Sequence, residues 1–571
     1  MNSFRDRAIY RLTRHFFNSF FDVPFLHDRG PEAAVRVVIG LLAVLFAAGR
    51  LLARMYLKKY ALLDMLGSAE PYRRALLADD TLALALPMLV VAFVTVLAGD
   101  SLLPDETDFR ALMVLPVTER MIFSAKLMAV TLFAGLFIAG SHSAMTLFML
   151  LISSGRWAEH NLVSRLAAYA GAGLCASTFI VLAVVALNGL LVVFLPPRRL
   201  SQGTALLRSV LLCGLIVMVP LVARIPLLES SLASGSPYVL AMPPAWFLGI
   251  ERVLLGTDDG HLIRLAEIGV GAFLTATAIA FSTYVSVYKH FDRVLLRSSG
   301  GGRRPEQPWR FGRSTRSDRS DKGAFRAVLD FTRITLGRSA LHQGVVAGLS
   351  ACGIGLVLNS LIGNVNSSIR TSEWASAGLI EAVLWAPFAL MLTTAVALRA
   401  AFQLPVEYRA NWVFQMTEQD ETRHDQLRVV ERVLWAAIAL PIAITLPVDW
   451  LVLGPRAVMC VVVAAPYGLL LVEFLLASWQ RIPFTCSYLP GKRFVGQTLA
   501  LGAAAFWVFG GIGTFLVRRG LERPGRTAVV MAIIAGVAMV LRRNRLSRWR
   551  QHPLLFEDQL PELLRPLDLS R

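Results

Sequence analysis

The stretch LAAYAGAGLCASTFIVLAVVALNGLLVVFL, residues 166–195, contains no charged residue and decides what kind of protein this is. A helix rises about 1.5 Å per residue, so about 20 apolar residues cross the hydrocarbon core of a bilayer. The stretch exceeds that length, and its most polar side chain is the amide of Asn188. It therefore predicts a transmembrane helix.

The composition of the whole chain agrees with this prediction. Hydrophobic residues make up 55% of the 571 residues, charged residues only 17%, and the mean hydropathy is +0.57. Soluble domains carry about 25% charged residues. The net charge is +18, but the basic residues lie mostly at the ends of apolar runs, where lipid headgroups favour them. The sequence thus predicts a protein embedded in a lipid bilayer, with no nucleic-acid partner.

Apolar runs of this kind recur along the chain in two groups of six. The first group comprises residues 37–49, 81–99, 127–152, 166–195, 209–223 and 268–288, and the second comprises residues 343–369, 377–398, 433–448, 457–479, 494–517 and 527–541. The predicted fold is an all-α integral membrane protein with about 12 transmembrane helices in two six-helix halves. The run 37–49 is short and lies between Arg36 and Arg50, so it spans only if these arginines reach the headgroups.

A polar, basic segment separates the two groups. It contains three successive glycines and several arginines, and it has no apolar period, as a flexible cytoplasmic linker would. The predicted organisation is a first transmembrane half (1–292), the linker (293–326), a second transmembrane half (327–545) and a tail (546–571).

Each half opens with an amphipathic, basic stretch, residues 4–22 and 325–342. In the first, Leu12 and Phe16 recur at helical spacing, with arginines around the other side. Such helices lie in the plane of the membrane interface. The arginines of the linker and of the tail predict that both termini are cytoplasmic, because positive loops stay inside. Basic residues near positions 58–74 and 518–526 conflict with this topology.

Two loops that follow the second run of each half share a six-residue motif. It reads LPVTER at 115–120 and LPVEYR at 404–409. Both loops mix charges with large apolar side chains that a solvated loop does not need, so they predict a protein-docking surface, although the loops could instead dip into the membrane interface. The residues that would form the surface are Phe109, Leu112, Leu115, Pro116, Glu119 and Arg120 in the first loop and Leu404, Pro405, Glu407, Arg409, Trp412 and Phe414 in the second.

With this motif the chain resembles the membrane subunit, or permease, of type-2 ABC exporters. That family has an N-terminal interfacial helix, six spans, and a coupling helix after the second span that docks on an ATPase. A leucine–proline step then enters the third span, as residues 105–126 do here, and the segment 243–249 resembles the family's re-entrant segment. The resemblance is closest over residues 1–290, and the chain departs from the usual pattern in carrying two permease-like halves.

The resemblance implies a separate ABC-type ATPase, present in two copies. The chain has no Walker A sequence, since the nearest stretch, LPGKR at 489–493, lacks the upstream glycine and the Ser or Thr that would bind Mg²⁺. ATP and Mg²⁺ would therefore be bound by the partner, and this chain would carry no cofactor and no catalytic residue. The expected location is the bacterial inner membrane.

Three ionisable side chains inside the apolar runs are further functional hypotheses: Glu381, Glu473 and His142. The two acids lie near the ends of their runs and could equally be paired structural residues. A helix-contact role is the simpler interpretation of His142. The histidines and cysteines show no metal-ligand spacing, so no metal site is expected.

The function we expect is an ATP-driven exporter that moves an amphipathic or lipid-like substrate by alternating access. The runs contain small polar residues such as Asn359 but almost no charge, which suits an amphiphile better than an ion. A 12-span secondary transporter is the main alternative, disfavoured because the basic GxxxDR-type loop is missing. An integral-membrane enzyme is disfavoured because no cluster of catalytic residues lies at a membrane face.

Overall fold

A computed structural model describes residues 2–19, 46, 49–50, 52–65, 68–99, 118–299, 321–371, 377–404, 414, 416, 420–485 and 495–554. These residues are helical nearly throughout, and no strand occurs among them. The chain divides into two compact units, Met1–Arg304 and Pro305–Arg571, which we call unit 1 and unit 2. Each has an apolar core of its own, built around Tyr72 and Phe247 in unit 1 and around Phe388 and Val472 in unit 2.

Nine segments of the described residues are long and apolar enough to cross a membrane, so the chain is an all-helical, multi-span membrane protein. They are Glu70–Leu97, Arg120–Ser143, Leu162–Phe194, Gly203–Ala223, Gly260–Ser286, Leu341–Asn364, Ala377–Phe402, Arg423–Leu476 and Pro524–Gln551. The sequence predicts twelve spans. The difference arises because Arg423–Leu476 contains two of the predicted runs, residues 494–517 belong to no segment of the nine, and residues 37–49 lie largely outside the described part.

Unit 1 is organised around two central helices. Its long helices are α3 (Glu70–Leu97), α6 (Glu119–Ile152), α7 (Leu162–Phe194), α8 (Pro197–Ala223) and α11 (Gly260–Ser299). Helix α3 packs against α6, α7 and α8, and α7 also contacts α6, α8 and α11. The amphipathic helix α1 (Asn2–Ser19) packs against α6.

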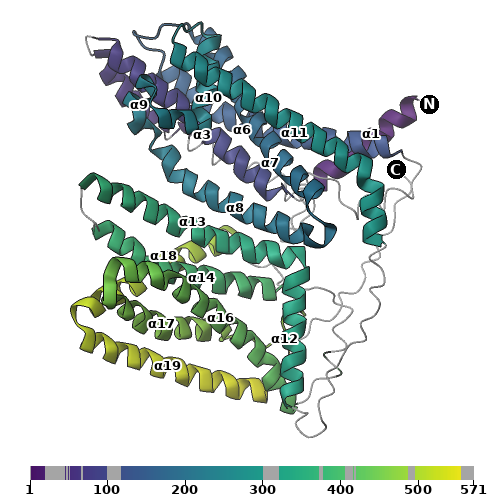
Figure 1. The fold of residues 1–571 in the computed structure, drawn as a ribbon, viewed down its shortest axis with the longest axis vertical. Coiled ribbons are helices and arrows are strands. Elements are labelled where there is room, and N and C mark those ends of the chain that lie inside the picture. Colours follow the sequence, from purple (N-terminus) through teal and green to yellow (C-terminus); the bar gives the residue numbers. More distant parts are fainter. Residues whose placement is uncertain are drawn as a thin grey trace. The chain divides into compact units, whose positions relative to one another are not determined.

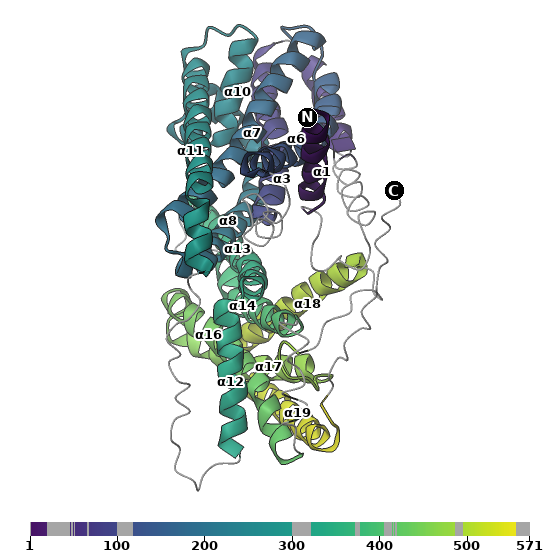
Figure 2. The same cartoon turned by 90° about the vertical axis from the view of Figure 1, so that its right-hand side faces the viewer.

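A short helix, α10 (Pro243–Leu254), fills the side of unit 1 between α3, α7 and α11. It has 12 residues and is therefore about 18 Å long, too short to span. Figures 1 and 2 show it beside the first half of α11. A Cβ at Gly249 would come within 2.6 Å of α11 backbone atoms, so only glycine permits this approach. This helix contains the expected re-entrant segment, 243–249.

Unit 2 contains α13 (Ala340–Thr371), α14 (Ala377–Phe402), α16 (Asp420–Leu453), α17 (Val458–Leu476), α18 (Val495–Glu522) and α19 (Pro524–Gln551). Helix α14 packs against α13, α16, α17 and α18, and α17 packs against α16, α18 and α19. The 3₁₀ turn η5 (Gly454–Ala457) joins α16 directly to α17.

The second amphipathic helix, α12 (Asp321–Arg338), lies crosswise at the end of the unit 2 helices in both views (Figures 1 and 2). Its buried residues Val328, Thr332 and Thr335 recur at helical spacing, and Arg326 and Arg333 are exposed. On α1 the buried residues are Leu12, Thr13 and Phe16. Both stretches therefore form helices with one buried face, as their periodicity predicts.

Candidate functional site

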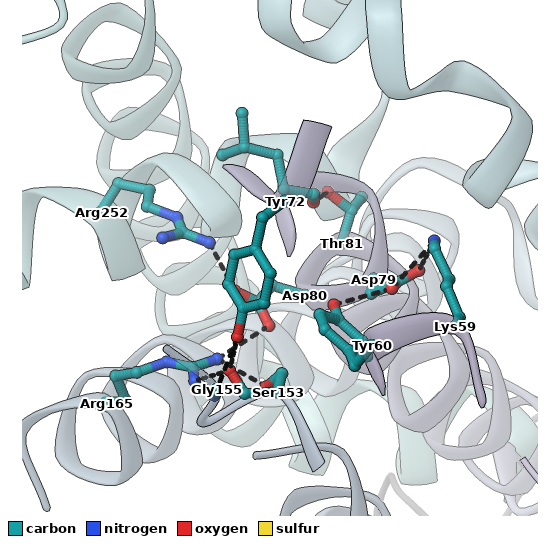
Figure 3. A network of polar contacts seen from close by, with 11 residues as sticks. Lys59, Tyr60, Tyr72, Asp79, Asp80, Thr81, Ser153, Gly155, Arg165 and Arg252 are labelled. Carbon is teal, nitrogen blue, oxygen red and sulfur yellow. Dashed lines mark hydrogen bonds and ion pairs between the residues drawn. The ribbon is translucent and has the colours of Figure 1, made fainter. Parts of the chain in front are cut away.

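Buried charges gather at one end of unit 1, where α3, α7 and α10 meet (Figure 3). Asp79 and Asp80 lie side by side on α3 and are 1% and 4% exposed. The helix continues directly from them into an uncharged run, so packing of that run draws both carboxyl groups into the protein. Carboxylates at this depth require charged or hydrogen-bonding partners.

Asp80 is held by two arginines from different helices. Arg252 of α10 forms an ion pair with it, and Nη2 of Arg165 on α7 lies 3.8 Å from its carboxylate. Arg165 also donates hydrogen bonds to the carbonyl oxygen and the hydroxyl of Ser153, at 2.9 and 2.8 Å. These bonds tie the start of α7 to the connection that leaves α6.

Asp79 faces the helical residues 52–65. Lys59 donates to its two oxygens at 3.1 and 3.2 Å, and the Tyr60 hydroxyl donates at 2.8 Å. Lys59 also bonds Glu229 at 2.9 Å. Burial, and next the charge of Asp79, raises the pKa of Tyr60 well above its usual value, so the hydroxyl keeps the proton that it donates.

Glu251 differs from the other buried acids of this cluster because its carboxyl group has no hydrogen-bond partner among the described residues. It is fully buried on α10. Burial, and next the negative charge of Asp80, raises the pKa of Glu251 to about 8. At neutral pH this side chain is therefore mainly a neutral acid, able to release a proton if its surroundings become wetter or more positive.

Unit 2 has a buried ion-pair cluster of its own on α16, α17 and α19. Arg545 donates to both oxygens of Glu473 at 2.8 Å, and its Nη2 lies 3.5 Å from Glu431. Arg542 donates to Glu431 at 2.7 Å. The Arg545 guanidinium also lies over the ring of Trp549, 4.2 Å from its centroid. Glu473, a sequence candidate for function, is thus a fully paired acid in this structure.

Glu381 and His142, the other intramembrane candidates, also have partners. Arg518 donates to Glu381 at 3.1 Å in an exposed ion pair. The Tyr169 hydroxyl donates its proton to the carbonyl of Ala83, so it accepts a hydrogen bond from Nδ1 of His142, at 3.2 Å. With its proton on Nδ1, His142 accepts through Nε2 from the hydroxyl of Ser177, at 2.8 Å. His142 therefore links α6 to α7.

Most of the predicted docking residues lie outside the described part of the chain, namely Phe109, Leu112, Leu115, Pro116, Pro405, Glu407, Arg409 and Trp412. Glu119 and Arg120 form the first turn of α6, with Arg120 exposed. Leu404 is buried two residues after the end of α14, and the ring of Phe414 lies 5.3 Å from that of Phe331 on α12.

The start of the LPVEYR loop is anchored by Phe484, from the connection between α17 and α18. Phe484 has a φ of 66°, in the left-handed region that side chains rarely adopt. Its N–H donates to the carbonyl of Phe402 at 3.0 Å, and its buried ring lies 4.7 Å from that of His342. His342 Nε2 in turn donates to the carbonyl of Leu404 at 2.9 Å. The segment 482–485 thus holds the loop's first residue, Leu404, in place.

Sequence reasoning missed Asp79, Asp80, Glu251 and Glu431. It treated the charges beside apolar runs as the ends of spans, whereas the helices carry these side chains into the protein. The one available signal was the pair Asp79-Asp80 directly before an uncharged run, since adjacent acids at such a place need compensating cations. Among the described residues, no group of three or more His, Cys, Asp or Glu could hold a metal ion.

The chain matches no protein-family model, and no curated protein or solved structure is significantly similar to it.

Proposed function

We propose that the chain is the membrane-spanning permease of an ATP-driven ABC exporter, with twelve spans in two equivalent six-span halves and a separate ATPase. The observation that carries this proposal is the matching place of the amphipathic helix in the two units. In each unit this helix packs on the long helix that an LPVxxR motif leads into, α1 on α6 and α12 on α16. Helix α6 begins at Glu119, within the first motif, and α16 begins at Asp420, 11 positions after the end of the second motif. That arrangement puts a membrane-surface helix and a docking loop at the same end.

The contacts lie about two to three turns from the start of the receiving helices. In unit 1, Nζ of Lys126 lies 4.8 Å from the ring centroid of Phe16, and the Thr13 hydroxyl contacts Met128. In unit 2, Arg432 lies 6.0 Å from the ring of Phe325. An interfacial helix packed at these positions would transmit a movement of the LPVxxR loop to the transmembrane helices of its unit.

The wider packing supports two equivalent halves. Helices α3, α6, α7, α8 and α11 of unit 1 correspond in chain order to α14, α16, α17, α18 and α19 of unit 2. The pairs α3–α6, α3–α7, α3–α8, α6–α7, α7–α8 and α7–α11 all have a counterpart: α14–α16, α14–α17, α14–α18, α16–α17, α17–α18 and α17–α19. Alternating access between halves of one design is a common solution for transporters.

The proposal assigns ATP and Mg²⁺ to two copies of the ATPase and no catalysis to this chain. Both termini and the linker are cytoplasmic, in a bacterial inner membrane, and the substrate is an amphipathic or lipid-like molecule. Several of the basic residues that conflict with this topology have acidic partners: Lys59 with Asp79, Arg73 with Glu159, Arg74 with Glu70 and Arg518 with Glu381.

The test is affinity purification of the tagged chain from its native membrane. We expect an ABC-type ATPase to accompany it. The double variants Phe109→Ala/Leu112→Ala and Trp412→Ala/Phe414→Ala should release the ATPase, because apolar anchors contribute roughly 2 kcal/mol each at an interface.

Leu227→Ala and Trp450→Ala are matched controls, since both side chains are exposed and lie at the other end of their units' helices. Membrane yield and thermal melting of each variant show that the chain remains folded. Unchanged recovery of the ATPase with both double variants would contradict the docking proposal, and absence of any ATPase from the wild-type sample would contradict the function.

Glu251 favours one second candidate, a proton-coupled secondary transporter. A fully buried acid with a pKa near neutrality can bind and release a proton during a transport cycle. Transport by the purified chain in proteoliposomes, driven by a pH gradient without ATPase, would favour this candidate.

A further inference from the structure

A cavity of about 660 Å³ opens in unit 2 between α13, α14 and α18. Its volume is in the range of small-molecule sites. The three helices lie within one unit, so the cavity does not depend on how the two units are arranged. We propose that it binds the head and upper chain of a zwitterionic phospholipid with a primary ammonium group. This inference rests on the proposed function, because it names the class of amphiphile that the exporter accepts.

The mouth of the cavity carries one charge of each sign. Glu381 of α14 and Arg518 of α18 are paired at 3.1 Å, and their side chains are 60% and 64% exposed. An ion pair this exposed contributes little to stability. The ion pair can therefore open at a small cost in free energy, and each of the two side chains can bind a ligand instead.

Two tryptophans also line the cavity. Trp385 on α14 and Trp507 on α18 stack with ring centroids 5.6 Å apart and planes 17° apart. A Cβ at Gly510 would lie 2.3 Å from Nε1 of Trp385, so glycine there admits the ring. Flat aromatic faces of this kind contact acyl chains and the glycerol region of a lipid.

Helix α13 contributes an amide to the lining of the cavity. Asn359 lines the cavity, and its side chain makes no hydrogen bond with another described residue. An amide without a partner on a membrane helix is costly, and an ester or hydroxyl oxygen of a bound lipid would satisfy it.

The charges select the head group. A phosphate satisfies the Arg518 guanidinium, and an ammonium with N–H donors satisfies the Glu381 carboxylate. An anionic lipid would satisfy Arg518 but place its charge beside Glu381. A choline head has no N–H to donate. The expected order of affinity is therefore phosphatidylethanolamine, then phosphatidylcholine, then phosphatidylglycerol.

The test is native mass spectrometry of the full chain in detergent, without ATPase. The probes are the dioleoyl forms of these three lipids. Glu381→Gln and Arg518→Gln should each weaken phosphatidylethanolamine binding about tenfold, the effect of losing one charge-assisted hydrogen bond. Arg519→Gln is the matched control. It removes an equally exposed ion pair on the same helix, with Glu522, outside the cavity.

Trp507→Ala should weaken all three lipids alike, because its ring contacts the chain and not the head. Equal binding of the three lipids by the wild-type chain would overturn the proposal. So would unchanged preference in both ion-pair variants, or loss of preference in Trp507→Ala. Because no ATPase is present, these results stand apart from the ATPase recovery that tests the proposed function.

Discussion

Units 1 and 2 share several helix–helix contacts in the same chain order, but they bury their ion pairs at opposite ends of the matching helices. Helices α7 and α17 hold the same central place in their units. In unit 1 the buried Arg165 lies one turn after the start of α7, whereas in unit 2 the buried Glu473 lies one turn before the end of α17. With the proposed topology, buried ion pairs link the helices of unit 1 at their outer end and the helices of unit 2 at their cytoplasmic end.

This difference separates two roles in the fold. The shared helix pairs come from packing of apolar and small residues, which needs no particular charge. The ion pairs then fix how the helices are aligned at one end of each unit, because buried charges can select one packing arrangement over others. If this is right, breaking a cluster should affect its own unit most.

The largest effect is expected from Arg545→Ala. This change leaves Glu473 and Glu431 buried with one cation fewer, and loss of one partner of a buried ion pair costs roughly 3–5 kcal/mol. Thermal melting of the purified protein in detergent should show a clear loss of stability. Arg548→Ala, one turn further along α19 and exposed, is the matched control and should change little. Equal effects of the two variants would show that the cluster does not hold unit 2 together.

An intermediate effect, dependent on pH, is expected from Glu251→Gln. The pKa of Glu251 is higher in the folded protein than its ordinary value of 4.5. The folded state therefore keeps a proton that the unfolded state loses, and stability should fall as pH rises from about 4.5 to about 8. The glutamine variant should lack this pH dependence and be more stable than the wild type at pH 8. Melting curves from pH 5 to 8.5 measure the slope.

Glu267→Gln, on α11, serves as the control for that experiment. Parallel pH dependence in the wild type and in Glu251→Gln would show that Glu251 is ionised in the folded protein, and would remove the case for a stored proton in unit 1.

The smallest effect on stability is expected from Arg518→Gln. Its ion pair with Glu381 is exposed, so the free energy of unfolding should change by about 0.5 kcal/mol or less. A much larger loss of stability would mean that ion pairs stabilise unit 2 at both ends of its helices. Units 1 and 2 would then differ less in this respect than their buried clusters indicate.

Much of the helix plan could be predicted from the sequence. The apolar runs predict most of the long helices because about 20 such residues can satisfy their backbone in a membrane only as a helix. The burial of Leu12 and Phe16 follows from their spacing. The number of spans was harder, because α16 and α17 are joined by one 3₁₀ turn and the run 37–49 is short.

The charge clusters could not be predicted from the sequence. Asp80 meets Arg252 across 172 positions of the chain, and Arg545 meets Glu473 across 72. A lone charge beside an apolar run is compatible with a headgroup, a solvated loop or a buried partner, and the sequence does not distinguish these environments. The sequence by itself determined a helical protein for a membrane. Only the tertiary structure decided which charges leave water, because that depends on which helices pack together and at which depth.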